Sequence, residues 1–301
     1  MSAQNWLRLV ILSVVWGGSF FFVEVALQDV PPFTIVFLRV SLAALALLLV
    51  IKMRGGRIPF TLSLWGSFLV MGLLNNVIPF CLIVWGQTYI TGSVASILNA
   101  TTPIFTLLVA HLFTSDERLT FNKLLGVLVG FVGVFVMMQP TLKEGLSWSS
   151  YSQLAVLGAA ISYAFAGIWG KRLKQESPLV NAAGMLTCSS IILLPIVFTV
   201  EAPLSVTPQI DSMASIIAIA LLSTAVAYML YFKILAGAGA TNLLLVTFLI
   251  PASAILLGLS MLDETVETMA LSGMAIIFAG LLLIDGRVLN AVQQKELRHA
   301  N

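Results

Sequence analysis

The stretch Asp116 to Gly133, DERLTFNKLLGVLVGFVG, has a counterpart 147 residues later in DETVETMALSGMAIIFAG, from Asp263 to Gly280. The acidic pair and the first and last glycines coincide in the two copies. At the same offset Trp16 aligns with Tyr163. The chain therefore consists of two halves with one plan.

Each half holds five long apolar segments. An odd number of membrane crossings makes the second half enter the bilayer from the side opposite to the first, which gives an inverted repeat. Inverted repeats are typical of secondary transporters, because two equivalent bundles can expose a midplane site to either side in turn. The fold class predicted is an all-α membrane protein of ten transmembrane helices, arranged as two inverted five-helix repeats.

Composition supports a membrane location. Of 301 residues, 59% are hydrophobic and 9% are charged, and the mean hydropathy is +1.03. Such a chain has too little polar surface for a soluble globule of this size, and spans of about 20 apolar residues cross a bilayer. The ten predicted spans are Leu7–Leu27, Phe33–Val50, Leu64–Gly86, Thr91–Phe113, Leu124–Met138, Gln153–Gly170, Leu179–Val200, Met213–Phe232, Thr241–Leu262 and Met269–Ile284.

Basic residues predict the orientation, because cytoplasmic loops accumulate them. Of the 15 Lys and Arg residues, Arg39 lies within a span, Lys143 lies in an outer loop, and the others fall on the side of the N-terminus. We therefore expect both termini in the cytoplasm. The net charge of +2 reflects this bias, and no basic run interleaved with aromatic residues suggests a nucleic-acid partner.

The predicted domains are a first five-helix repeat over residues 1–140, a second, inverted repeat over 153–288 and a cytoplasmic tail over 289–301. A polar stretch from Thr141 to Ser152 separates the repeats. Cys81 and Cys188 lie inside predicted spans, where a small buried side chain explains a cysteine better than a disulfide does. No soluble domain is expected.

A set of motifs lies along the chain: Trp16-Gly17-Gly18-Ser19-Phe20, Arg39, Pro103 and Asp116-Glu117-Arg118-Leu119-Thr120, with a second copy that holds Pro251 and Asp263-Glu264. In these motifs the chain resembles the EamA-like branch of the drug/metabolite transporter superfamily. The resemblance implies a ten-helix carrier whose central cavity is lined by helices one to four and six to nine, with helices five and ten at the periphery. Many relatives export amino acids or other small metabolites across the bacterial inner membrane. The second copy departs from the first in having Leu186 where Arg39 stands.

Aromatic residues near the middle of two spans are the first candidates for substrate binding. Trp16 lies in the first span and Tyr163 in the sixth, so the inverted repeat would turn both toward one midplane cavity. They would stack on a substrate or form a hydrophobic gate, with plain packing as the alternative. Tyr228 lies closer to the cytoplasm and is a candidate for a gate, for an interface belt or for binding.

Neutral polar residues at similar depths are the second set of candidates. Asn75 and Asn76 are central in the third span, Asn99 and Thr102 lie in the fourth, and Thr247 lies in the ninth. A buried amide without partners costs a few kcal/mol. Adjacent helix positions point about 100° apart, so one of the two adjacent asparagines is expected to line the cavity and the other to bond a neighbouring helix. Interhelical hydrogen bonding is the favoured explanation for each of these residues taken alone.

Prolines occupy matching places in the fourth and ninth spans, at Pro103 and Pro251. Each removes a helix hydrogen bond. Mirrored kinks would suit helices that bend as hinges around a cavity, and simple packing is the alternative.

Ionisable residues inside spans are few. Glu24 and Arg39 lie at similar depths near the outer side, so an ion pair is the first expectation and proton coupling through Glu24 the second. His111, near the inner end of the fourth span, is a weaker candidate for coupling. No carboxylate occurs at mid-membrane, so passive facilitation or exchange stays open.

Other classes of protein fit less well. The sequence has no Gly-x-Ser-x-Gly and no His-Glu-x-x-His, and it holds 2 histidines, so we predict neither an enzyme nor a metal or cofactor site. No motif in the sequence indicates the selectivity filter of a channel. The predicted function is an inner-membrane secondary transporter of small amphipathic metabolites, with amino-acid export first. A multidrug or other metabolite carrier, or a non-transport membrane protein, is the alternative. The predicted partners are the substrate and the bilayer, with the chain a monomer or a weak homodimer.

Overall fold

The computed structural model describes residues 2–114, 119–143, 145–173, 175–243 and 245–285. Asp116, Glu117 and Arg118 of the repeated motif and the tail from 289 to 301 lie outside these ranges. The described chain is helical throughout and holds no strand. Nine of its helices are long and apolar enough to cross a membrane, and Val246–Met261 is a shorter apolar helix. These ten segments correspond in order to the ten predicted spans.

The first half of the chain forms the first five segments. They consist of α1 (Ala3–Ala26), α2 (Pro32–Met53), the succession α3 (Leu62–Gly72), η1 (Leu73–Val77) and α4 (Ile78–Gly86), the pair α5 (Gly92–Asn99) and α6 (Thr102–Phe113), and α7 (Phe121–Lys143).

The second half forms the other five. They consist of α8 (Trp148–Trp169) with the turn η2 (Gly170–Leu173), α9 (Pro178–Val200), the succession α10 (Ile210–Ala220), η4 (Leu221–Val226) and α11 (Ala227–Ala238), the pair α12 (Ala240–Leu243) and α13 (Val246–Met261), and α14 (Thr268–Asp285). A short turn, η3 (Pro203–Ser205), lies between α9 and α10.

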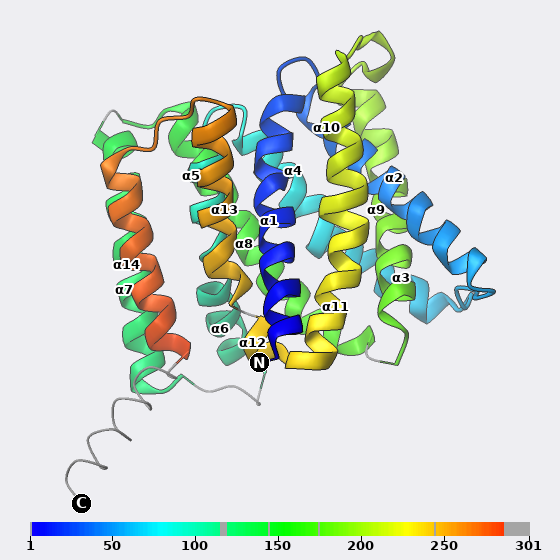
Figure 1. Ribbon diagram of the computed structural model, residues 1–301, viewed down its shortest axis with the longest axis horizontal. Helices are drawn as coiled ribbons and strands as arrows, with labels where there is room; N and C mark the ends of the chain where they lie inside the picture. Colours follow the sequence, from blue (N-terminus) through cyan, green and yellow to red (C-terminus); the bar gives the residue numbers. More distant parts are fainter. Residues whose placement is uncertain (1, 115–118, 144, 174, 244, 286–301) are drawn as a thin grey trace, which may run out of the picture.

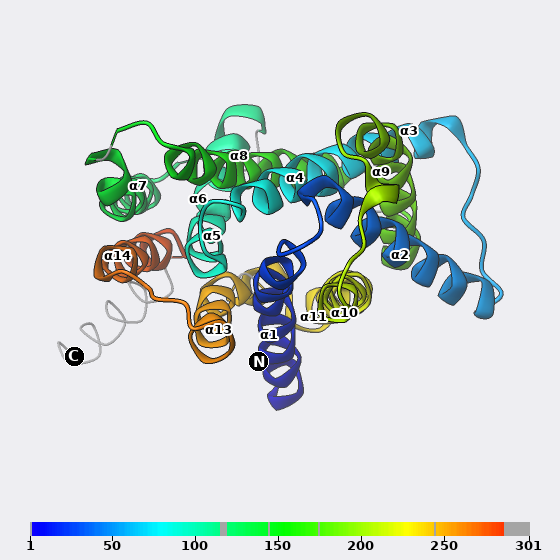
Figure 2. The ribbon, with the colours of Figure 1, turned by 90° about the horizontal axis from the view of Figure 1, so that it is seen from above.

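Two ends of the bundle are distinguished below. The lower face holds the start of α1 and the loop between α8 and α9, and the upper face holds the end of α1 and the start of α10 (Figure 1). Seen from above, α1, α10 and α13 lie on one side of the bundle and α4, α8 and α9 on the other (Figure 2).

Helices of the two halves pack against each other throughout. The pairs are α1 with α13, α2 with α9, α4 with α8 and α7 with α14. Close backbone approach makes this possible: a Cβ on Gly17 would lie 2.9 Å from the amide of Ala254, and one on Gly72 would lie 2.6 Å from the carbonyl of Met185. The halves are therefore one interleaved body, and the centre of the bundle is a seam between them.

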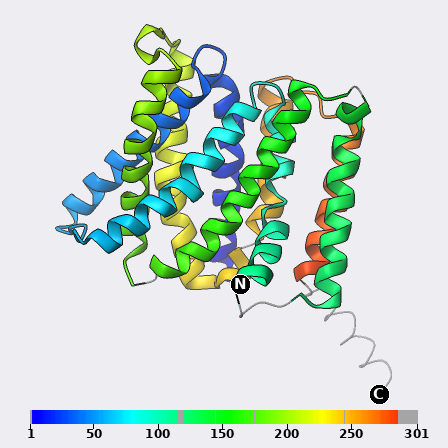
Figure 3. The same cartoon turned by 180° about the vertical axis from the view of Figure 1, so that it is seen from behind.

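The α7–α14 pair stands at the edge of the bundle (Figure 3). A Cβ on Gly126 would lie 2.6 Å from the carbonyl oxygen of Gly280, and one on Gly133 would lie 2.8 Å from that of Gly273. Small residues at such positions let helices approach closely in a membrane. The outer sides of both helices are exposed, as at Phe135, so this pair is remote from the centre.

The helix ends differ from the sequence prediction at α8. It begins at Trp148, five residues before the predicted span, because Ser147 and Ser150 form a capping box. Reciprocal capping satisfies the first amides of a helix. Because this first turn is polar, the apolar pattern of the sequence does not predict that the helix begins there.

The third and eighth spans share an irregularity. Both contain a π-helix, and the two begin 148 residues apart, at Leu73 and at Leu221. π-Helical turns inside α-helices occur frequently at functional sites. The fourth span is broken between Asn99 and Thr102, just before Pro103, whereas α13 continues through Pro251. The expected mirrored kinks are therefore unlike each other in the structure.

Candidate functional site

A cavity of about 840 Å³ lies at the seam between the halves. Both halves line it, with Trp16 and Phe80 from the first and Tyr163 and Thr247 from the second. At its upper end the lining residue Gln87 is buried, at 6% exposure. At the lower face it reaches the exposed Lys171 in the loop between α8 and α9. The cavity is thus closed above and open below.

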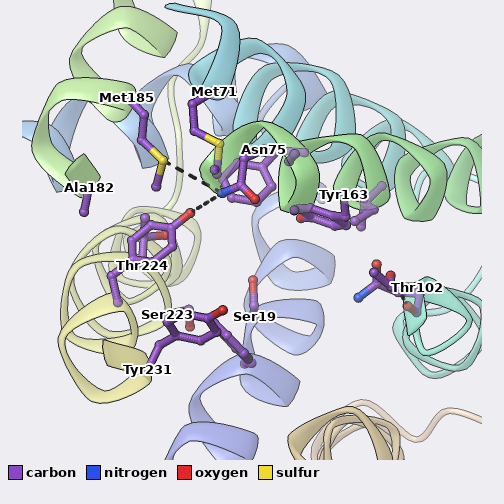
Figure 4. A pocket seen from close by; sticks show the side chains of 18 of the residues that line it. Ser19, Met71, Asn75, Thr102, Tyr163, Ala182, Met185, Ser223, Thr224 and Tyr231 are labelled. Carbon is purple, nitrogen blue, oxygen red and sulfur yellow. Dashed lines mark hydrogen bonds between the residues drawn. The ribbon is translucent and has the colours of Figure 1, made fainter. Parts of the chain in front are cut away.

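Aromatic rings form much of the wall. The rings of Trp16 and Tyr231 have centroids 5.9 Å apart, at an interplanar angle of 46°. Tyr163 projects from α8 on another side of the cavity, as Figure 4 shows. The two aromatic residues that align in the repeat, Trp16 and Tyr163, therefore line the same cavity.

The amides of η1 join the halves through a tyrosine. Asn75 Nδ2 donates to the Tyr228 hydroxyl at 2.9 Å, and this hydroxyl donates to Asn76 Oδ1 at 3.0 Å. Asn76 Nδ2 donates in turn to Ser189 Oγ at 3.1 Å. Asn75 lines the cavity (Figure 4), whereas Asn76 is fully buried, at 0% exposure. One amide thus faces the cavity and the other holds α9.

Arg39 lines the cavity near its upper end. Its Nε donates to Thr224 Oγ1 of η4 at 3.0 Å, and its guanidinium carbon lies 3.8 Å from the centroid of the Phe80 ring. The side chain is 8% exposed. Sequence reasoning did not select Thr224, because nothing in the pattern of an apolar span tells which helix a buried arginine meets.

The expected ion pair between Glu24 and Arg39 does not occur in the described chain. Glu24 Oε2 instead accepts a hydrogen bond from the amide of Gly92, at 2.8 Å. Similar depth was the argument for the pair, but the guanidinium points to η4 and the carboxylate to the start of α5. Depth along a helix does not fix the direction of a side chain.

A second carboxyl group meets Glu24. Glu264 accepts a hydrogen bond from Ser93 Oγ, and the neighbouring Gly92 donates its amide to Glu24, so the two carboxyl groups lie close enough to act on each other. Nearby, Gln87 Nε2 donates to the carbonyl of Phe20 at 2.9 Å. Glu264 belongs to the second copy of the acidic motif. The repeat therefore indicated that this residue is important, but it did not predict which group the residue contacts.

Further contacts between the halves close the upper face. Glu201, at the end of α9, accepts hydrogen bonds from the amides of Phe33 and Thr34 at 3.0 and 2.7 Å and from Thr34 Oγ1 at 2.8 Å. A carboxylate at the N-terminus of a helix meets unpaired amides and the positive end of the helix dipole. Asp29 accepts a hydrogen bond from the amide of Gln209. These acidic residues follow the ends of spans, where sequence reasoning did not look for partners.

The break in the fourth span places polar atoms at the cavity. Asn99 and Thr102 both line it, and Thr102 Oγ1 donates to the carbonyl of Asn99 at 2.7 Å. Asn99 Oδ1 is buried and has no hydrogen-bond partner among the described residues. Pro103 occupies the first turn of α6, where its missing amide costs nothing.

Five of the selected residues are not part of the cavity lining, namely Glu24, Asn76 and Pro103, whose contacts are given above, and His111 and Pro251. His111 is exposed near the lower end of α6, where its Nδ1 accepts a hydrogen bond from the amide of Leu119 at 3.3 Å. Pro251 is buried within α13 beside the lining residue Ile250. Within the described ranges, no three His, Cys, Asp or Glu residues gather to hold a metal.

Comparison with known proteins identifies relatives of both halves. The model of the EamA-like transporter family matches residues 5–139 and again 150–285. The uncharacterized transporter YoaV of Bacillus subtilis is 22% identical, with 92% of this chain and 95% of YoaV covered. The uncharacterized inner membrane transporter YedA of Escherichia coli K12 is 23% identical, with 93% and 90% covered.

A third relative, from Salmonella typhimurium, is named a probable amino-acid metabolite efflux pump. It is 25% identical, with 94% of this chain and 95% of the relative covered. One solved crystal structure matches 94% of this chain and 98% of its own with a TM-score of 0.66 at 16% identity. At that identity the likeness concerns the fold.

Proposed function

Because the chain belongs to the EamA-like transporter family, we propose that it is a secondary transporter of small amphipathic metabolites, with amino-acid export from the bacterial cytoplasm as its first activity. The observation that carries the proposal is the cavity at the seam, which is closed at the upper face and open at the lower. Alternating access needs such a site between two bundles that can rock.

The chemistry of the wall suits an amphipathic molecule. Trp16, Tyr163 and Tyr231 offer apolar ring surface, and Asn75 and Asn99 offer neutral hydrogen bonds. A small metabolite with one polar end and one apolar end uses both. The Salmonella relative named a probable amino-acid metabolite efflux pump supports amino acids as the first class to test. Transport of several kinds of drug is the alternative function that the same cavity lining would allow.

The direction follows from the basic residues. Arg8, Lys52, Lys171 and Lys233 belong to the lower end of the bundle, and cytoplasmic loops accumulate such residues. With the lower face in the cytoplasm, the open cavity is ready to load a cytoplasmic substrate. Opening of the upper face, with loss of the Glu201 and Asp29 contacts, would then release that substrate outside. An inverted arrangement of the two repeats, as predicted from the sequence, would supply the second state.

Glu24 is the residue we propose for coupling. It lies beside Glu264 at the closed end, and a proton binding there would affect the approach of α1 to the loop before α14. Arg39 and His111 are weaker candidates for coupling, because Arg39 is held by Thr224 and His111 is exposed away from the cavity lining.

Uptake into proteoliposomes tests the proposal. Purified protein is reconstituted, and a panel of radiolabelled amino acids is supplied with and without a pH gradient. Trp16→Ala and Asn75→Ala should each abolish saturable uptake. Trp6→Ala, at a side chain 46% exposed on the same helix, and Asn122→Ala, at an exposed position of α7, should leave it unchanged.

Two results would contradict the proposal. If folded wild-type protein moves no amino acid but moves amphipathic drugs, the amino-acid assignment is wrong and the multidrug alternative replaces it. If Trp16→Ala and Asn75→Ala transport as well as their controls do, the cavity is not the substrate path.

A further inference from the structure

We propose that Arg39 binds a carboxylate of the transported molecule, so that the cavity selects small monocarboxylates with an apolar body. This inference rests on the proposed function and names its substrate class. The observation behind it is a buried cation that the protein does not neutralise. Arg39 is 8% exposed, and no carboxylate of the described chain pairs with it.

The surroundings of Arg39 explain why a partner is needed. The ionisable groups of the described chain that act on it are the hydroxyls of Tyr163 and Tyr228, which are neutral at physiological pH. A buried guanidinium without a counter-charge is costly, and such groups are generally paired. The face of the Phe80 ring, 3.8 Å away, offsets part of this cost through a cation–π contact. An anion from the cavity would offset the rest.

The guanidinium is held so that it can receive that anion. Its Nε edge is occupied by Thr224 Oγ1, and one face is covered by Phe80. Neither Nη1 nor Nη2 has a hydrogen-bond partner among the described residues. These two groups present parallel N–H donors, which is the arrangement that a carboxylate accepts in two hydrogen bonds.

Charge along the cavity favours a single negative charge on the ligand. Among the described residues, Arg39 is the one charged residue of the deep lining, and the other charged lining residues, Lys171 and Glu176, come from the loop at the lower mouth. A phosphate dianion would need further buried cations. The remaining deep wall is largely apolar, as at Met71, Met185 and Ile250, so the body of the ligand is apolar.

Four probes of one size separate the carboxylate from the amine. Phenylalanine carries both groups, 3-phenylpropanoate carries the carboxylate alone, and phenylalaninamide and phenethylamine carry only the amine. Binding of each to the purified full chain is measured by isothermal titration calorimetry, and uptake is measured in proteoliposomes. Wild-type protein should bind the acids in preference to the two amines. Phenylalanine bound without phenylpropanoate identifies an amino-acid site, and both acids bound identify a general monocarboxylate site.

Variants at the anchor test the role of Arg39. Arg39→Gln should weaken binding of the acids by roughly 10- to 100-fold, because hydrogen bonds to a charged group are lost. The affinity for the two amines should stay as in the wild type. Arg57→Gln, at an exposed position of the loop at the lower face, should have no effect. Should Arg39→Gln fail to fold, Arg39→Lys removes the planar fork and Thr224→Val frees its Nε, and each should lower affinity for the acids alone.

Three results would overturn the inference. Wild-type protein that binds the amines as tightly as the acids would remove the carboxylate anchor and leave the proposed transport intact. Binding of none of the four probes by folded protein would overturn the anchor together with the proposed class of amphipathic substrates. An Arg39→Gln variant that keeps the preference for acids would assign the carboxylate to another group.

Discussion

The carboxyl groups of Glu24 and Glu264 lie beside each other at the closed end of the cavity, although the two residues come from different halves of the chain. The start of α5 supports both: Gly92 donates its amide to Glu24, and Ser93 donates its hydroxyl to Glu264. Two carboxylates this close repel each other unless one of them is protonated. We therefore predict that their approach depends on a proton at the upper face.

Glu24→Gln tests that dependence. Raising the pH removes this proton and favours opening of the upper face, so uptake by wild-type protein should change with an imposed pH gradient. A glutamine amide places no charge beside Glu264 and carries no titrating proton, so the variant should transport without a response to the gradient. Asp211→Asn, at an exposed position on α10, should keep the response. An undiminished response in Glu24→Gln would move coupling elsewhere.

Glu201 allows a second test of the contacts that hold the upper face closed. Glu201→Gln removes the charge that accepts three hydrogen bonds from Phe33 and Thr34. Hydrogen bonds to a charged group contribute about 1.5–3 kcal/mol, so losing the charge should shift the population by about 10-fold toward a state open above. Spin labels at Thr88 and Leu204, in a background without Cys81 and Cys188, report the separation of the halves.

The matched control for this experiment is Glu267→Gln, at an exposed position near the start of α14. It should leave the distance distribution of the spin labels as in the wild type. Identical distributions for Glu201→Gln and the control would show that Glu201 does not hold the upper face closed.

The Tyr228 hydroxyl connects the side-chain amides of Asn75 and Asn76, so its removal should lower the stability of the protein. Tyr228→Phe removes the short hydrogen bonds of Asn76 Oδ1 and Asn75 Nδ2 and leaves only the longer contacts of Asn75 Nδ2 with Asn76 Oδ1, at 3.5 Å, and with Met185 Sδ, at 4.0 Å. An unsatisfied buried polar group costs about 1–3 kcal/mol. We expect a lower melting temperature in detergent and a higher KM. Tyr151→Phe, at a side chain 46% exposed, should change neither. A Tyr228→Phe variant as stable as the wild type would indicate that water replaces the hydroxyl.

Apolar periodicity and the repeat were enough to predict the order of the ten apolar helices. Trp16, Asn75 and Tyr163 were selected by depth, and all three line the cavity. Depth does not fix rotation about a helix axis, which is why Glu24 and Arg39 were expected to pair and do not. Glu201 meets Thr34 across 167 residues, and no local pattern identifies a partner at that separation.

The packing of α7 on α14 makes a last prediction, which separates stability from transport. A Cβ on Gly126 would lie 2.6 Å from the carbonyl oxygen of Gly280, so Gly126→Ala must push the helices apart, at about 1–3 kcal/mol. The pair stands outside the cavity lining, so KM should stay as in the wild type while the melting temperature falls. Gly66→Ala is the matched control, because a Cβ there meets nothing within 4 Å and alanine favours helix. A changed KM in Gly126→Ala alone would mean that these peripheral helices move with the cavity during transport.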